Sequence, residues 1–272
     1  MKRTKLAYLL MLPALLLTAC GDGNEIKDQE KIDEIESNIS NKVLDVNCFE
    51  LSVKLDSSSY DKDTDKNINV KADIKYQINE AGDKYLKSTG TNDGVKSEST
   101  IYLVKNEKYK QVLYVSSYNP DTKENDVTVY GYDGNEMTFG FSGLYFLVGE
   151  AYYTAFADPL LVDYSTISSS SENVEYDADV KYYSKGDDNL TVKANIKAKG
   201  EVDKNADEYT VSGNYTVRYE NGYFKSAIVD GTSNKGNKSK NEVNVTIKKD
   251  LKIELPKGWE DLINKNSISG LA

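Results

Sequence analysis

The chain has 272 residues, a formal net charge of −10 and no histidine. The absence of histidine excludes the commonest general base, Ser-His-Asp and Cys-His nucleophile activation, and most zinc-site patterns. The excess of acidic residues, 44 Asp and Glu against 34 Lys and Arg, disfavours a nucleic-acid partner, because phosphate backbones repel such a chain. We therefore predict no catalytic residue, no metal site and no cofactor. A hydrolase that uses two carboxylates is the enzymatic alternative.

Residues 1–19 have the features of a secretory signal peptide: a basic start, an apolar run from Leu6 to Leu17 and small residues at the cleavage site. The segment Leu17-Thr18-Ala19-Cys20 resembles the lipobox of bacterial lipoproteins. The resemblance implies that a diacylglyceryl group is attached to the thiol of Cys20 and that cleavage follows between Ala19 and Cys20. We therefore expect a protein that is lipid-anchored on the extracytoplasmic face of the cell membrane.

The remaining chain is expected to be a lipid-anchored tether at 20–30 followed by one β-rich domain at 31–272. The preference for lysine over arginine, together with abundant Asn and Tyr, indicates an AT-rich genome and hence a Gram-positive source. If Cys20 is acylated, Cys48 is the remaining thiol and no intrachain disulfide forms. Cys48 is out of phase with Phe49 and Leu51, so we expect an unpaired surface or edge thiol in a monomeric protein.

An amphipathic helix is predicted first, with Asn24 as its cap and an apolar stripe of Ile32, Ile35, Ile39 and Val43. Two blocks of strands follow, in which apolar and polar residues alternate. The first block comprises Phe49–Leu55, Ile68–Ile78, Ser99–Val104, Lys108–Ser117 and Asp126–Tyr132, and the second comprises Val174–Tyr182, Leu190–Ala198, Tyr209–Tyr219, Tyr223–Val229 and Val243–Leu255.

Such alternation is typical of antiparallel strands with one solvated and one apolar face. Asn221-Gly222 is a type I′ hairpin signal within the second block. The loop Asp61–Asn67 has the alternate-residue spacing of an EF-hand, but Lys66 stands where that loop needs glycine and Ala72 where it needs its closing glutamate. We interpret it as a solvated hairpin loop and predict no calcium.

An apolar stretch between the two blocks has helical spacing, with a second, shorter helix expected after Asp158-Pro159. We expect this insert, at 141–164, to cover the apolar face of the sheet. The fold class predicted is therefore mainly antiparallel β with helical cover (α+β): a curved, half-barrel-like sheet of about ten strands with helices on its apolar face. The alternatives are a β-sandwich and a pair of small β-modules joined by the insert.

The order of helix, strands, helical insert and further strands is similar to that of the LolA and LppX-like lipoprotein group. The resemblance implies an apolar cavity that binds or carries a lipid or other amphiphile. The alternative is a non-catalytic cell-surface interaction or structural lipoprotein whose core is filled by its own side chains. The residues expected to line a cavity are Phe141, Leu144, Tyr145, Val148, Tyr152, Tyr176 and Tyr215.

Replacement of Cys20 by serine should leave an uncleaved, unlipidated precursor, because a hydroxyl cannot form the thioether to the diacylglyceryl group. The wild type should partition into detergent and incorporate radioactive palmitate, since two acyl chains give stable membrane anchoring. Equal palmitate incorporation by Cys20→Ser would end the lipoprotein interpretation.

Overall fold

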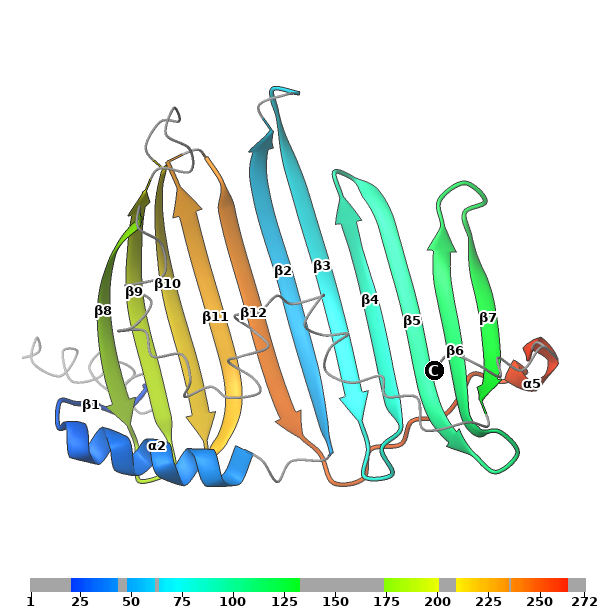
Figure 1. Cartoon of the computed structure of the whole chain (residues 1–272), viewed down its shortest axis with the longest axis horizontal. Helices are drawn as coiled ribbons and strands as arrows, with labels where there is room; N and C mark the ends of the chain where they lie inside the picture. The colour runs from blue at the N-terminus through cyan, green and yellow to red at the C-terminus, as the bar shows by residue number, and fades with distance from the viewer. Residues whose placement is uncertain are drawn as a thin grey trace, which may run out of the picture.

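A single antiparallel sheet dominates the computed structural model, which describes residues 21–43, 48–61, 64–132, 174–200, 209–234 and 236–263. Within these ranges there are twelve strands and two helices (Figure 1). The strands are β1 (Asn24–Ile26), β2 (Phe49–Asp61), β3 (Lys66–Ile78), β4 (Lys84–Asn92), β5 (Val95–Asn106), β6 (Lys110–Asn119), β7 (Glu124–Tyr132), β8 (Val174–Ser184), β9 (Leu190–Gly200), β10 (Tyr209–Glu220), β11 (Tyr223–Ser233) and β12 (Lys238–Ile247). The helices are α2 (Gln29–Val43) and α5 (Trp259–Leu262).

The sheet consists of two meanders, β2–β7 and β8–β12, which meet where β12 pairs with β2. The full order is β1-β8-β9-β10-β11-β12-β2-β3-β4-β5-β6-β7. Between β10 and β11, Asn221 (φ 54°) and Gly222 (φ 81°) have the two positive φ angles that a type I′ turn requires. The predicted hairpin at Asn221-Gly222 is therefore confirmed. Asp93 and Gly94, with φ of 47° and 83°, make a similar turn between β4 and β5.

The two faces of the sheet differ because side chains alternate along each strand and paired residues point to the same side. We call the face that carries Val53, Val192 and Val217 the inner face, and the opposite one the outer face. The hydrophobic core lies on the inner face and joins residues of both meanders to α2. Its buried members are Ile35, Ile39, Phe49, Leu51, Val53, Ile74, Tyr76, Leu86, Leu190, Val192, Val217, Tyr219, Phe224, Ala227, Val243 and Val245.

Helix α2 crosses the ends of β8–β11 on the inner face (Figure 1). Ile32, Ile35 and Ile39 are buried, so the predicted apolar stripe is confirmed for these residues. The helix begins at Gln29, and the carboxylate of Asp28 caps it by accepting a hydrogen bond from the Glu30 N–H (3.1 Å). The expectation that Asn24 caps this helix is wrong, because that residue lies in β1.

The predicted α+β class with helical cover is wrong. The described residues form an almost entirely antiparallel β structure with one open sheet of twelve strands, rather than about ten strands under a layer of helices. The β-sandwich alternative is wrong as well. Both predictions fail because β12 pairs with β2, from Lys238↔Ser58 to Ile247↔Phe49. This pairing joins the two blocks of strands into one continuous sheet. The insert at 141–164 lies outside the described residues.

Cys48 also differs from its prediction. It is a free thiol, as expected, but it is buried rather than exposed. Its carbonyl accepts a hydrogen bond from the Lys248 N–H (3.2 Å), which holds the residue beside the last strand. Among the described residues, no helix has the length and apolarity needed to cross a membrane.

The packing of α2 on the inner face generates a stability prediction. Ile35 is 1% exposed, so Ile35→Ala should lower the free energy of unfolding by about 2–4 kcal/mol, through lost apolar contact and the cavity left behind. Lys31→Ala, on the exposed side of the same helix, should change it by less than about 0.5 kcal/mol. Urea denaturation followed by circular dichroism measures both, and equal stability of the two variants would contradict this packing.

Candidate functional site

Most residues predicted for the site cannot be located, because they lie outside the described ranges: Ala19, Cys20, Phe141, Leu144, Tyr145, Val148 and Tyr152. Tyr176 lies in β8, where the backbone register with Ala198 of β9 places it on the inner face. Its side chain is not among those described.

Tyr215 lies on the inner face of β10 and is half-buried. A Cβ atom on Gly213 would lie 3.1 Å from its Cε2 atom, so the ring rests against the glycine two positions away on its own strand. Burial raises the pKa of the Tyr215 hydroxyl. Tyr215 is level with Ala194 of β9 and Tyr176 with Ala198, so the structure places both tyrosines on one face without bringing them together.

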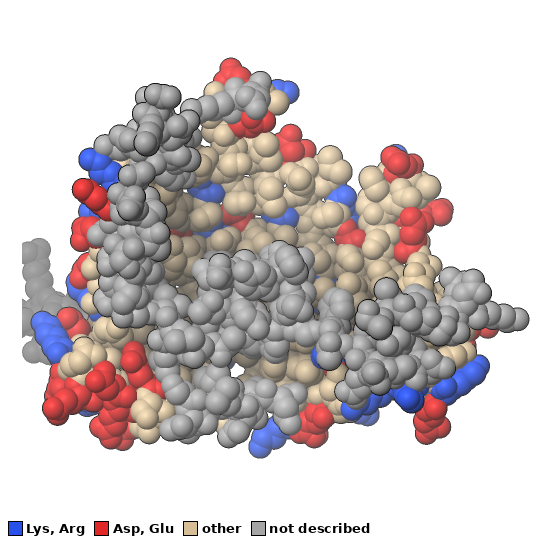
Figure 2. All heavy atoms as spheres, viewed as in Figure 1, with Lys and Arg blue, Asp and Glu red and all other residues tan. Residues whose placement is uncertain are grey.

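The inner face changes in character from one end to the other. At the α2 end it carries large buried side chains such as Phe49, Tyr76 and Leu86. Towards the opposite end the same face carries small and hydroxyl-bearing residues among apolar ones. The small and hydroxyl-bearing residues are Ser57, Gly90, Ser97, Gly213, Gly231, Ser233 and Ser239, and the apolar ones include Ile68, Val70, Val95, Val211 and Val229. Ser88, Ser99 and Ser117 lie level with Val53. Figure 2 shows this end as a mostly uncharged, hollowed surface with the majority of charged side chains at its rim. The face is thus richer in small and hydroxyl-bearing residues towards that end than at the α2 end.

On the outer face, an ion-pair cluster fixes the N-terminal segment. Asp22 contacts two basic residues of neighbouring strands: its Oδ1 lies 3.1 Å from Arg218 Nε and its Oδ2 lies 2.6 Å from Lys193 Nζ. The Asp22 side chain is only 20% exposed. Burial raises the pKa of this carboxyl, but the hydrogen bonds and charges of Lys193 and Arg218 outweigh burial, and the pKa is lowered.

The backbone around Gly23 requires glycine. Its φ is 101°, and a Cβ atom there would lie 2.2 Å from the carbonyl oxygen of Ser184. The next residues form β1, which pairs antiparallel with the end of β8 from Asn24↔Ser184 to Ile26↔Tyr182. Residues 20–30 are predicted as a tether, and the structure places an ion-pair cluster and a strand within them.

A second charged cluster surrounds Glu50 on the outer face of β2. Its Oε2 atom lies 3.0 Å from Lys75 Nζ and 3.1 Å from Lys248 Nζ, and it accepts a hydrogen bond from Gln77 Nε2 (2.5 Å). Burial raises the pKa of the Glu50 carboxyl, and these three partners outweigh burial, so the pKa is lowered to about 2. The carboxylate therefore stays charged at neutral pH, where it joins β2, β3 and the segment after β12.

Three tyrosines continue the same row of the outer face across β4, β5 and β6. The ring centroids of Tyr85 and Tyr102 are 4.8 Å apart, and those of Tyr102 and Tyr114 are 5.7 Å apart with the planes nearly perpendicular. Burial raises the pKa of Tyr85 and of Tyr102. All three side chains are half-buried, so their rings are partly available to a partner.

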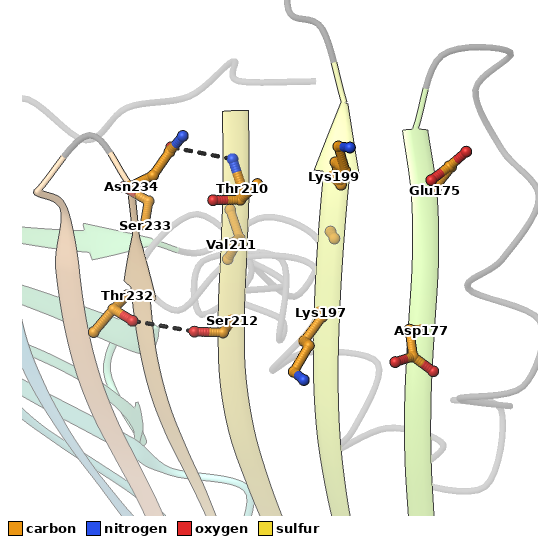
Figure 3. Close-up of a pocket in the computed structure, with 11 residues that line it drawn as sticks. Glu175, Asp177, Lys197, Lys199, Thr210, Val211, Ser212, Thr232, Ser233 and Asn234 are labelled. Atoms are coloured by element: carbon orange, nitrogen blue, oxygen red, sulfur yellow. Dashed lines mark hydrogen bonds between the residues drawn. The ribbon is translucent and has the colours of Figure 1, made fainter. Parts of the chain in front are cut away.

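A polar pocket of about 620 Å³ lies on the outer face of β8–β11, at the end away from α2 (Figure 3). Hydrogen bonds join its β10 and β11 walls: Ser212 Oγ lies 3.2 Å from Thr232 Oγ1, and the Thr210 N–H donates to Asn234 Oδ1 (3.1 Å). Two carboxylates on β8 face two lysines at directly paired positions of β9, through Asp177↔Lys197 and Glu175↔Lys199. The charged side chains that line the pocket are thus balanced, two carboxylates against two lysines.

No group of His, Cys, Asp and Glu side chains that could hold a metal ion occurs among the described residues. The hairpin from Asp61 to Lys66 joins β2 to β3. At this hairpin Thr64 Oγ1 donates to Asp61 Oδ2 (2.8 Å) and Tyr60 OH donates to Asp65 Oδ1 (2.5 Å).

No known protein family matches this chain, and no curated protein is significantly similar to it.

The charge of Glu50 generates a pH-dependent prediction. The pKa of Glu50 is lowered by folding from an ordinary value of 4.5 to about 2, so its contribution is present above pH 4.5 and is lost as the pH falls towards 2. Glu50→Gln should therefore destabilise the fold by about 1 kcal/mol at pH 7 and flatten the loss of stability between pH 4.5 and 2.

The matched control is Asp56→Asn on the same strand and face, because Asp56 is 58% exposed and pairs with Lys71 alone among the ion pairs found there. Exposed pairs contribute little, so this variant should change stability by less than about 0.5 kcal/mol. Urea denaturation across this pH range measures both, and an unchanged acid slope in Glu50→Gln would contradict the prediction.

Proposed function

We propose that this chain is a bacterial lipoprotein, anchored by lipid on Cys20 at the extracytoplasmic face of a Gram-positive cell membrane, that binds an amphiphile along the inner face of its sheet without catalysis. The signal peptide and the Leu17-Thr18-Ala19-Cys20 motif support the anchor. The observation that supports amphiphile binding is the change along the inner face, from large buried apolar side chains at the α2 end to a mixture of serine, glycine and smaller apolar residues at the other.

The two ends of that face suit the two ends of an amphiphile. Partly buried hydrophobic residues, among them Leu55, Ile78 and Ile101, border the core and offer apolar contact to a hydrocarbon chain. Burial contributes about 0.8 kcal/mol per methylene, so a chain of about twelve methylenes gains on the order of 10 kcal/mol before the costs of association. The serine hydroxyls at the opposite end can donate to and accept from a polar head group.

A second candidate function is a cell-surface interaction lipoprotein that binds a protein or an envelope polymer. The row of Tyr85, Tyr102 and Tyr114 on the outer face favours it, because tyrosine combines apolar contact area with a polar tip and is enriched at interfaces. This function needs no ligand on the inner face, and it is therefore distinguishable from amphiphile binding.

Two adjacent residues of β5 provide the test. Ser99 lies on the inner face and Thr100 on the outer face, and both are half-buried. Ser99→Trp places a bulky ring on the proposed binding surface and should weaken binding of a fluorescent fatty-acid analogue by about tenfold or more. Thr100→Trp adds the same ring to the other face and should leave the affinity unchanged. Fluorescence titration, with circular dichroism to confirm the fold, measures both.

Wild-type protein that is folded but binds no such analogue would rule out the amphiphile function and leave the interaction function in its place. Equal losses of affinity in Ser99→Trp and Thr100→Trp would place the binding surface elsewhere.

A further inference from the structure

We propose that the outer face of the sheet at the α2 end of β8–β10, around Asp22, Lys193 and Arg218, lies against the lipid surface, and that the Asp22 cluster sets the orientation of the domain on the membrane. The inference rests on the proposed lipidation of Cys20 and concerns what the folded domain does once it is anchored there.

The first argument is chain length. Cys20 precedes Asp22 by two residues, and an extended chain spans about 3.3–3.6 Å per residue, so the two Cα atoms lie within about 7 Å of each other. Asp22 is held on the outer face by Lys193 (2.6 Å) and Arg218 (3.1 Å). An acyl group on Cys20 therefore brings the bilayer surface next to β9 and β10.

The second argument is that this attachment is rigid. Gly23 lies in a conformation that favours glycine, with no room for a Cβ atom beside Ser184. β1 then adds a strand to the edge of β8. Three successive elements, the ion pairs, the close approach at Gly23 and the strand pairing, thus leave no flexible linker between Asp22 and the sheet.

The third argument is the chemistry of the surface. The chain is acidic overall, yet Lys193 and Arg218 supply two positive charges against the single carboxylate of Asp22. Lys193 Nζ also lies 5.1 Å from the centre of the Tyr183 ring, and tyrosine next to a basic residue suits the headgroup region of a bilayer. Further out, Lys181 pairs with Asp179 at 3.5 Å, so these two charges offset each other.

The test uses lipidated full-length protein in vesicles of equal parts phosphatidylcholine and phosphatidylglycerol that contain a headgroup-nitroxide lipid. A fluorophore is attached to a single added cysteine at Lys181→Cys, directly paired with Lys193, or at Lys71→Cys, on the outer face of β3, which lies six strands away from β8 in the sheet. Cys48 is buried and should remain unlabelled, which protein without an added cysteine verifies. Quenching at position 181 should exceed that at position 71 several-fold.

The role of the cluster is tested by two variants in the same vesicles. Asp22→Ala removes the ion pairs and Gly23→Ala disrupts the path of the chain, so each should bring the two quenching values close together without loss of vesicle binding. Glu25→Ala is the control, because Glu25 lies in β1 but pairs only loosely with Lys27 (3.7 Å), and it should retain the wild-type ratio. Urea denaturation verifies that each variant is folded.

Palmitate incorporation distinguishes a failure of the proposed lipid anchor from a failure of the proposed orientation. Wild-type protein that incorporates palmitate and binds vesicles, yet shows equal quenching at positions 181 and 71, would overturn the orientation alone. Wild-type protein without palmitate would overturn the lipid anchor and the orientation together. A wild-type ratio in folded Asp22→Ala and Gly23→Ala would show that the cluster does not set the orientation.

Discussion

The pairing of β12 with β2 is the interaction on which the rest of the structure depends. It joins two meanders that are each built from local hairpins, and it brings Val243 beside Val53 although most of the chain separates them in sequence. Such long-range pairing closes a large loop, at an entropic cost that only the completed core offsets. The apolar row of the inner face continues across this junction, and the Glu50 cluster reinforces it from the outer face through Lys248 and Lys75.

Once the two meanders form one sheet, the chain has two faces with separate roles. The inner face receives α2 and carries the core, and serine and glycine become more frequent along it away from α2. The outer face carries charges, the tyrosine row and the N-terminal attachment. Because alternation puts neighbouring residues on opposite faces, the proposed ligand surface and the proposed membrane-facing surface use different side chains of the same strands.

Much of the β structure was predictable from the sequence, because alternation is a local signal. The ten strands expected from that pattern all exist, and Asn221-Gly222 makes the expected turn. β4 was not predicted, because its apolar residues Tyr85 and Leu86 are adjacent and the rest of the strand is Lys, Ser, Thr, Gly and Asn, so apolar and polar residues do not alternate. Asp93-Gly94 was nevertheless a signal for the hairpin turn that follows it. The joining of two blocks into one sheet was not predictable, because alternation gives each strand an apolar face without saying which strand lies beside it. Hence the half-barrel with helical cover and the sandwich were both wrong.

The candidate site likewise combines a feature that a contiguous motif suggests with contacts that only strand pairing produces. The proposed lipobox is a contiguous motif that the sequence alone can suggest, whereas the partners of Asp22 are Lys193 and Arg218, which only the folded sheet brings to it. Serine stands at inner-face positions such as Ser57 and Ser97, but the sequence does not show that these residues lie near one another, because their alignment depends on the strand register. The proposed anchor is therefore suggested by a local motif, whereas the proposed orientation of the domain and the proposed ligand surface depend on strand pairing.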